Sequence, residues 1–272
     1  MIDLHTHSRV SDGTLSPTEL VTLAASRGVE VLALTDHDTV AGLAEARSAA
    51  PESLRLVAGV EISVSWENKT LHVVGLDVDP SHTTLAAGLT RLQQQREVRA
   101  RKIGDRLEAK GVAGAYSGAL ALAGDARPTR THFARFLHQA GHVKDEAQAY
   151  RKWLGRGKPA HVNAAWASLE EAIHWIHAAG GQAVLAHPFR YGMTRAWLVK
   201  ALTAFKQVGG DAVEVVSGRG NPDEFHVALH LAQRFALAAS VGSDFHAPSP
   251  WLQPGVEISL PDDIRSVWRD FR

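Results

Sequence analysis

The 272-residue chain contains no cysteine and only 2 methionines, and its formal net charge is zero. The lack of cysteine excludes disulfides, thiolate metal ligands and a cysteine nucleophile. No uninterrupted apolar run is long enough to span a membrane, and the first residues lead directly into a candidate motif without the apolar stretch of a signal peptide. We therefore expect a cytoplasmic protein that binds no membrane and needs no obligate protein partner.

The zero net charge conceals an uneven distribution. Residues 91–158 hold 15 lysines and arginines against 6 aspartates and glutamates, whereas the rest of the chain holds 14 against 23. Such a segment is often simply a solvated helical surface. An acidic body nevertheless suits cation binding, and a basic segment suits a polyanionic substrate, so we expect the segment to contact one.

Short apolar runs alternate with helical patterns on both sides of the basic segment. The predicted strands are residues 2–4, 31–34, 57–62, 71–76, 183–186, 212–216 and 237–241. Capping boxes at Ser16 and Ser168 begin two of the helices between them. From about residue 81 to residue 159 the β-like runs stop, and the periodicity predicts helices over 85–109, 131–139 and 146–153. This pattern predicts an α/β barrel (residues 1–80 and 160–272) with an inserted, mostly helical subdomain (residues 81–159) that binds the substrate.

Histidines and carboxylates gather where the predicted strands end. The residues in these positions are His5, His7, Asp12, His37, Glu61, His187, Asp244 and His246. Parallel strands of an α/β barrel deliver their carboxyl ends to one face, so these side chains should converge although they lie far apart in the sequence. Neutral imidazole and carboxylate together suit Mn, Zn or Fe(II). The sequence therefore predicts a metal centre at this face.

Four further polar residues are less clearly placed. His72 opens its strand rather than closing it, and it fits the site only if that strand runs antiparallel at the edge of the sheet. Glu214 interrupts an apolar strand, where either a place in the site or a buried structural role is compatible with the sequence. Asp36 and Asp38 flank His37, and we expect them to orient ligand imidazoles by hydrogen bonds.

Six short motifs occur in a fixed order between residue 3 and about residue 250: His-Thr-His, Ser-Asp-Gly, Thr-Asp-His-Asp, Gly-Val-Glu-Ile-Ser, Ala-His-Pro and Gly-Ser-Asp-Phe-His. The set resembles the polymerase and histidinol phosphatase (PHP) family of phosphoesterases. The resemblance implies a distorted (β/α)7 barrel that binds two or three divalent metal ions. Mn²⁺ is the expected metal, with Zn and Fe as alternatives. It also adds His72 to the eight ligands found by position. Asp12 stands where some relatives carry histidine, which makes occupancy of the metal on that side variable.

The long basic insertion makes the chain most similar to the bacterial nucleoside 3′,5′-bisphosphate phosphatases, also described as 5′-to-3′ exonucleases of short RNA. This likeness implies removal of a 3′-phosphate, with Asp12, His37, Glu61, His187 and Asp244 as the residues that carry the chemistry. The expected substrate contacts are Arg99, Arg101, Lys102, Arg130, Thr131, His132, Arg135 and Arg190, with base stacking on His132 or Phe133. Two alternatives stay open: a phosphatase of the histidinol-phosphate type, and a non-catalytic nucleic-acid-binding module.

Overall fold

A seven-stranded sheet in the order β1-β2-β3-β4-β5-β6-β7 forms the centre of the computed structural model, which describes residues 1–219 and 221–272. The strands are β1 (Ile2–Thr6), β2 (Val31–Leu34), β3 (Arg55–Trp66), β4 (Lys69–Leu76), β5 (Gln182–Leu185), β6 (Ala212–Ser217) and β7 (Ala238–Gly242). Neighbouring strands are parallel except that β4 runs antiparallel to both β3 and β5. Backbone hydrogen bonds from His7 N to Phe245 O (2.9 Å) and from Asp244 N to His5 O (2.8 Å) join β1 to the segment after β7. The sheet therefore curls into a nearly closed barrel, which confirms the predicted fold.

A layer of small and branched apolar side chains fills the barrel. Each of the seven strands contributes to this layer: Leu4, Ala33, Val57, Val74, Val184, Ala212 and Ala238. Val267, from the short helix η3 (Val267–Asp270), packs against the same layer. Because the interior is packed rather than open, polar groups at the strand ends rest on a rigid apolar support.

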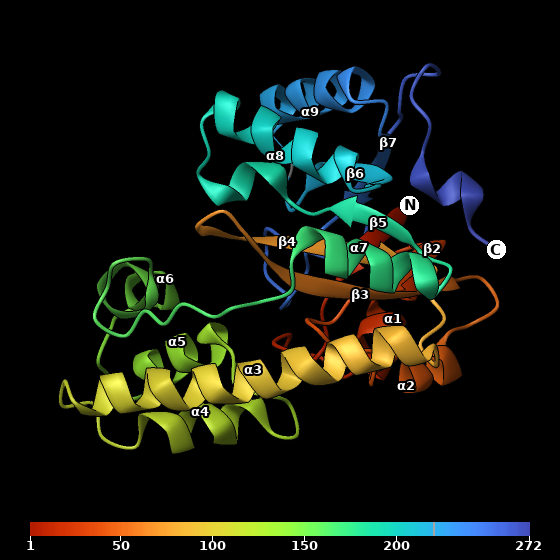
Figure 1. Ribbon diagram of the computed structural model, residues 1–272. Coiled ribbons are helices and arrows are strands. Elements are labelled where there is room, and N and C mark those ends of the chain that lie inside the picture. The colour runs from red at the N-terminus through yellow and green to blue at the C-terminus, as the bar shows by residue number, and fades with distance from the viewer. Residues whose placement is uncertain (220) are drawn as a thin grey trace.

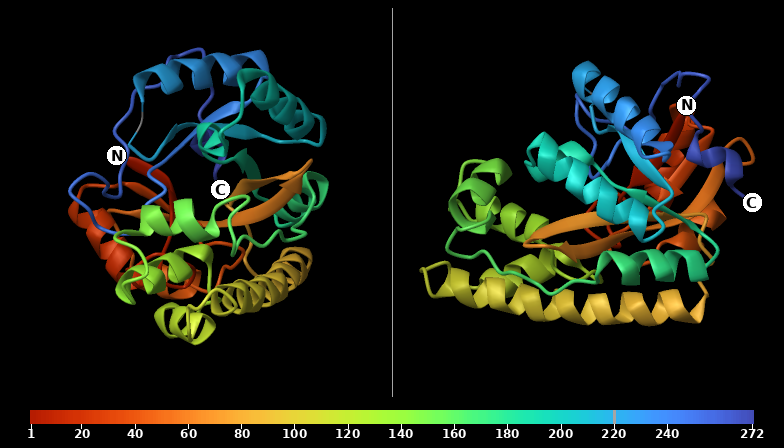
Figure 2. Two further views of the ribbon diagram at one scale, coloured as in Figure 1. Left: turned by 90° about the vertical axis from the view of Figure 1, so that its left-hand side faces the viewer. Right: turned by 45° about the horizontal axis from the view of Figure 1, so that its top comes forward.

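Helices α1 (Pro17–Ser26), α2 (Leu43–Ala49), α7 (Leu169–Ala178), α8 (Arg195–Gln207) and α9 (Pro222–Arg234) surround the sheet (Figures 1 and 2). Both predicted capping boxes are present. The Ser16 hydroxyl accepts a hydrogen bond from Glu19 N (3.1 Å), and the Glu19 carboxylate accepts one from Ser16 N (2.7 Å). Ser168 and Glu171 repeat the arrangement at α7. Within the described residues, no helix combines the length and the apolar character that a membrane span requires.

The insertion is built on the long helix α3 (Thr83–Glu108), which runs from beneath the barrel to the far end of the insertion in Figure 1. Helices α4 (Ala115–Ala123), α5 (Arg130–Gln139) and α6 (Glu146–Ala149) follow, with a π-helical turn η1 (Tyr150–Leu154). α3, α5 and the helical segment from α6 through η1 match the predicted helices, whereas α4 was not predicted.

Helix α3 belongs to two apolar cores. Near its start, Leu85 and Leu92 pack into the core that the barrel shares with its surrounding helices. Nearer its end, Ile103 and Leu107 pack into a separate core made mostly of insertion residues, to which Ala160 and Val162 also belong. Since one continuous helix joins both cores, it holds the insertion against the barrel.

Candidate metal centre

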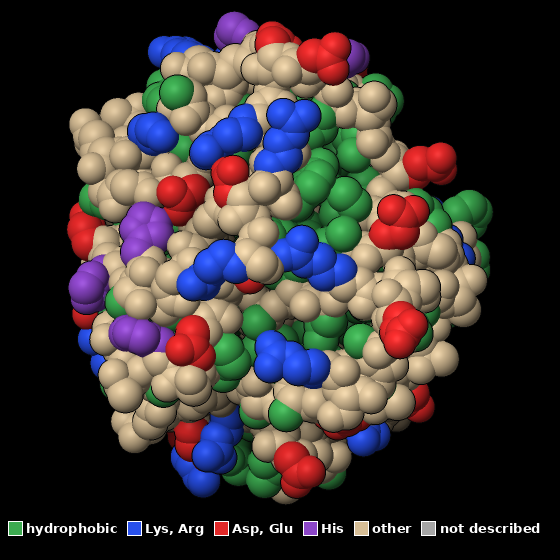
Figure 3. Space-filling model, turned by 90° about the vertical axis from the view of Figure 1, so that its right-hand side faces the viewer, with side chains coloured by type: hydrophobic (Ala, Val, Ile, Leu, Met, Phe, Trp, Pro, Cys, Tyr) green, Lys and Arg blue, Asp and Glu red, His purple; other side chains and the backbone are tan. Residues whose placement is uncertain are grey.

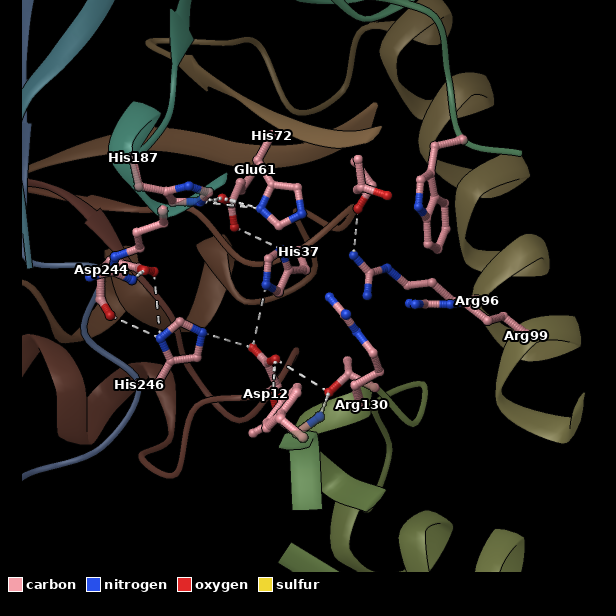
Figure 4. Close-up of a pocket in the computed structure, with 17 residues that line it drawn as sticks. Asp12, His37, Glu61, His72, Arg96, Arg99, Arg130, His187, Asp244 and His246 are labelled. Carbon is pink, nitrogen blue, oxygen red and sulfur yellow. Dashed lines mark hydrogen bonds and ion pairs between the residues drawn. The ribbon is translucent and has the colours of Figure 1, made fainter. Parts of the chain in front are cut away.

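The predicted ligands meet at the carboxyl ends of the parallel strands (Figure 4). Seven of them line one cavity of about 460 Å³: Asp12, His37, Glu61, His72, His187, Asp244 and His246. His5 and His7 are fully buried beside them, in contact with Glu61 and Asp244. His72 lies at the same end of the barrel because β4 runs antiparallel to its neighbours, which is the condition that the sequence set for it. The expected edge position is wrong, however, because β4 lies between β3 and β5.

Glu61 lies at the middle of this cluster. Its Oε1 is 2.8 Å from His72 Nδ1 and 2.9 Å from His187 Nε2, whereas its Oε2 is 2.8 Å from His37 Nδ1 and 3.3 Å from His7 Nε2. The two carboxylate oxygens thus face different sets of imidazoles. A carboxylate in this position is able to serve two neighbouring cations at once.

The donor atoms fit divalent metal ions. Three groups of nitrogen and oxygen atoms lie within 4.8 Å of one another: His7, Asp12, His37 and His246; His5, His7 and Glu61; and His37, Glu61 and His72. Two imidazole nitrogens, His5 Nε2 and His7 Nε2, approach to 3.1 Å while both face the carboxylates of Glu61 and Asp244. Asp12 Oδ1 and Glu61 Oε2 are buried without a hydrogen bond. Converging lone pairs with buried, unsatisfied oxygens are what a bound cation would satisfy.

The electrostatics of the cluster keep its main carboxylate ionised and one central imidazole neutral. Burial by itself would raise the pKa of the Glu61 carboxyl, but the imidazoles of His72, His37 and His5 hold that pKa well below its usual range. Burial also lowers the pKa of His7 to about 3. Carboxylate and neutral imidazole are the forms that bind metal ions, so these two residues are ready to ligate at neutral pH.

Three residues at the site have backbone angles that are uncommon for side chains other than glycine. Asp38, His187 and Asp244 have φ values of 53°, 28° and 50°. Hydrogen bonds hold each of them: Asp38 N donates to Glu61 O (2.9 Å), His187 N to Glu214 (2.6 Å) and Asp244 N to His5 O (2.8 Å). Such strained residues persist only where their surroundings fix them, and they concentrate at functional sites.

Glu214 fixes two of the predicted ligands from beneath. Its Oε1 lies 2.6 Å from His5 Nδ1, and its Oε2 accepts the hydrogen bond from His187 N. The carboxylate is 2% exposed. The sequence left its role open, and the only signal was a charged residue within an apolar strand. The structure makes it the group that orients His5 and the turn at His187.

We expect Glu214→Gln to weaken metal binding by about 10- to 100-fold, since the loss of a group that orients a ligand has effects of this size. Glutamine keeps one acceptor oxygen, whereas Glu214 accepts at both oxygens. Calorimetric titration with Mn²⁺ measures the change, and saturating Mn²⁺ should restore most of the activity. Glu170→Gln, on the exposed first turn of α7, is the control. An unchanged affinity for Mn²⁺ would contradict the role.

Asp36 and Asp38 do not orient imidazoles, which corrects the expectation from sequence. Asp36 accepts hydrogen bonds from Ser8 and Ser11 and thereby holds the loop after β1. Asp38 accepts from Ser63 N (2.7 Å) and pairs with Arg96 Nε (2.6 Å). Both carboxylates therefore shape the backbone around the ligands, one through hydroxyl groups and one through an arginine of α3.

The insertion reaches the metal centre through Asp12. Thr131 donates to the Asp12 carboxylate (2.9 Å), and Arg135 donates to the Asp12 carbonyl (2.8 Å). His132 is buried at the start of α5, where its Nδ1 accepts from Thr129 N (3.0 Å). Phe133 is fully buried in the core of the insertion, so neither ring is available to stack on a base. The stacking prediction is therefore wrong, and Arg135 has a structural partner in place of the expected phosphate.

Arg96, Arg99 and Arg130 stand across the cavity from the imidazoles (Figure 4). Arg96 is neutralised by Asp38. Arg99 instead donates its Nε to Val162 O (3.0 Å), and Arg130 lies over the ring of Tyr150. In the described part of the chain, neither of these two arginines forms an ion pair. Burial and repulsion by Arg130 and Arg96 lower the pKa of Arg99 to about 9. Crowded, unneutralised guanidinium groups facing a cavity favour an anionic ligand.

The other predicted substrate contacts lie in different places. Arg190 lines the cavity and pairs with Asp244. Arg101 pairs with Glu97 (2.7 Å) on the exposed side of α3, and it does not line the cavity. Lys102 faces a separate groove between α3 and residues 162–165. Arg99 also lines this groove, because residues three apart lie on the same face of a helix, whereas Arg101 points away from it.

This fold and site define an α/β-barrel protein with a buried histidine–carboxylate metal centre. The model of the PHP domain matches residues 3–177, and the chain belongs to the PHP family. It is 48% identical to a 5′-3′ exoribonuclease of Haemophilus influenzae, over 99% of this chain and 98% of that protein. It is also 48% identical to a 3′,5′-nucleoside bisphosphate phosphatase of Chromobacterium violaceum, over 99% and 95% of the two chains. A solved structure from the same organism, described as an amidohydrolase with bound sulfate and no metal, matches with a TM-score of 0.93 at 47% identity, over 99% of this chain and 95% of that chain.

Proposed function

We propose that this protein is a metal-dependent phosphoesterase that removes the 3′-phosphate of nucleoside 3′,5′-bisphosphates, and that it also trims short 5′-phosphorylated RNA from the 5′ end. The observation that carries the proposal is the pair of unneutralised arginines, Arg99 and Arg130, across one cavity from the metal ligands. A substrate with two phosphates suits a cavity that has arginines on one side and metal ligands on the other, because one phosphate is anchored while the other reacts. The names of the two 48% identical relatives support the same substrate class.

In the proposed reaction, the oxygen of water bonds to phosphorus and the bond between phosphorus and the 3′-oxygen breaks. The products are a nucleoside 5′-monophosphate and phosphate. Divalent ions at such a centre activate water and offset the charge that develops on phosphoryl oxygens. The side chains Asp12, His37, Glu61, His187 and Asp244 would hold these ions. Arg190, paired with Asp244, would face the reacting phosphate, and Arg99 with Arg130 would hold the 5′-phosphate.

We propose two or three bound ions, with Mn²⁺ first and Zn or Fe as alternatives. Nitrogen and oxygen donors without thiolate suit these metals. The proposed ligand set is His5, His7, Asp12, His37, Glu61, His72, His187, Asp244 and His246. For the chain as a whole, we propose a metal-binding barrel of residues 1–80 and 160–272 and a substrate-binding insertion of residues 81–159. The first half of α3 packs on the barrel, so the insertion is anchored rather than hinged there.

Manganese should stabilise the folded protein, because an ion that binds only the native state adds about 2.7 kcal/mol at a concentration 100 times its dissociation constant. For a chain of this size that corresponds to a rise in Tm of several degrees. Thermal unfolding after chelation, with and without added Mn²⁺, measures the rise. Glu61→Gln should abolish it, whereas Glu52→Gln at an exposed position should leave it intact. A wild-type Tm that does not respond to millimolar Mn²⁺ would contradict the metal centre.

A further inference from the structure

A second, larger cavity of about 820 Å³ opens beside the metal centre. It lies between the β3–β4 turn, residues 156–164 where the insertion leads back into the barrel, and the segment after β5. We name this cavity the basic groove. Arg99, Arg130 and Arg190 line both the groove and the metal-site cavity, so the two spaces are continuous.

The groove carries positive charge that its own carboxylate does not neutralise. Lys69 and Arg156 line it together with the three shared arginines. Its one acidic residue, Glu67, pairs with Lys200 at 2.7 Å. Among the described residues, neither Lys69 nor Arg156 forms an ion pair. Lys69 Nζ also lies 5.5 Å from the ring centre of Trp197, an exposed side chain that does not itself line the groove.

The opposite end of the molecule has a different charge pattern. In Figure 3, which faces that end, Lys and Arg side chains lie among Asp and Glu side chains. Ion pairs of this kind include Arg265 with Asp270 (3.1 Å) and Arg272 with Asp77 (3.5 Å). That end therefore carries charges of both signs side by side, whereas Glu67 is the one acidic residue among those that line the groove.

The cavity at the metal centre is already large enough for a nucleoside bisphosphate. Small-molecule sites commonly occupy about 300–1,000 Å³, a range that the cavity at the metal centre reaches without the groove. In an RNA substrate, the phosphate that reacts carries the rest of the chain on its other ester oxygen. That chain needs an exit from the metal centre. Arg190, which touches Asp244 and lines the groove, stands at this exit.

We infer that the basic groove binds the nucleotides that lie 3′ of the scissile phosphate in single-stranded RNA. This inference rests on the proposed function and extends it from a nucleotide to an oligonucleotide. Lys69 and Arg156 contact backbone phosphates there. The groove thereby distinguishes a short RNA from a nucleoside bisphosphate, which fills the first cavity alone.

The test compares two substrates, adenosine 3′,5′-bisphosphate and a 5′-phosphorylated tetraribonucleotide, with the full-length protein loaded with Mn²⁺. Lys69→Ala combined with Arg156→Ala should lower kcat/KM for the tetraribonucleotide about tenfold through KM, since both residues are at least partly exposed, where contacts between opposite charges are weak. The value for the bisphosphate should stay within about twofold. Arg47→Ala combined with Lys110→Ala removes the same two charge types at exposed positions outside both cavities and should change neither value.

Salt dependence gives an independent measurement of the same contacts. The loss of two phosphate contacts should make the dependence of log K for tetraribonucleotide binding on log salt concentration less steep by about 1.4, at about 0.7 per contact in single strands. Equal losses on both substrates, or no loss on either, would overturn the inference. If the wild-type protein hydrolyses neither substrate, the proposed function fails. Fluorescence anisotropy with the labelled tetraribonucleotide then tests whether the groove binds RNA. Weaker binding by the double variant supports the inference, and unchanged binding overturns it.

Discussion

Asp244→Asn is expected to lower kcat for phosphate release by about a thousandfold while the protein stays folded. Removing one group that stabilises charge in the transition state lowers kcat by about 10²- to 10³-fold. Asp244 contacts two groups that can act on this charge. Its Oδ1 lies 3.2 Å from His7 Nε2 within the metal cluster, and its Oδ2 pairs with Arg190. Asparagine has nearly the same shape but no charge. Steady-state release of phosphate from adenosine 3′,5′-bisphosphate at saturating Mn²⁺ measures the effect.

The folded state of this variant needs a separate measurement. The core of the barrel consists of apolar side chains that Asp244 does not contribute to, so the chelated variant should unfold at nearly the wild-type Tm. Asp105→Asn, at an exposed position on α3, is the matched substitution and should keep full activity. Near-normal turnover by Asp244→Asn with unchanged metal content would refute the assignment.

Residue position along the chain was enough to predict most of the metal cluster. A buried parallel strand appears in the sequence as an apolar run. The polar residue that follows each such run lies at the same face of the barrel, and this does not depend on the sequence between the strands. This reasoning placed His37 after β2 and His187 after β5 without reference to any relative. It left His72 undecided, because only an antiparallel strand presents its beginning to that face, and the direction of β4 is not encoded in its own periodicity.

Partner choice between side chains could not be predicted in the same way. Asp36 and Asp38 flank a ligand in the sequence, yet their partners are Ser8, Ser11 and Arg96, which come from other segments. Helix α4 was missed for another reason. Its sequence, Ala-Tyr-Ser-Gly-Ala-Leu-Ala-Leu-Ala, alternates small and apolar residues without the polar face that marks an amphipathic helix. Tertiary packing against α3 and α5 decides its conformation.

The arginines of the insertion show what the charge count predicts and what only the packing of side chains reveals. The charge count predicted that the insertion contacts an anion, but it did not distinguish between candidates such as Arg99, Arg101 and Arg130. Only the packing separates them: Arg99 and Arg130 line the cavity without a carboxylate partner, whereas Arg101 pairs with Glu97. An arginine that is already neutralised gains little from a substrate phosphate. One that is crowded by other cations gains most, since the anion relieves their repulsion.

The second large effect follows from this difference. The wild-type protein should hydrolyse adenosine 3′,5′-bisphosphate with a kcat/KM at least about a hundredfold above that for adenosine 3′-monophosphate, since hydrogen bonds to charged groups contribute about 1.5–3 kcal/mol each. Arg99→Gln combined with Arg130→Gln should remove most of this preference. The loss should fall on the bisphosphate alone, because the 3′-monophosphate has no 5′-phosphate for these arginines to hold. Parallel kinetics on the two substrates measure the ratio.

Using two substrates makes the test independent of general damage to the protein. A variant that misfolds or loses metal would lose activity on both substrates, whereas loss of an anchor changes only their ratio. Arg101→Gln, two residues along the same helix from Arg99, should keep the wild-type ratio because its guanidinium points away from the cavity to Glu97. Equal kcat/KM for the two substrates in the wild-type protein would rule out the anchor. A ratio that falls as much in Arg101→Gln as in the double variant would assign the preference to the overall charge of the insertion.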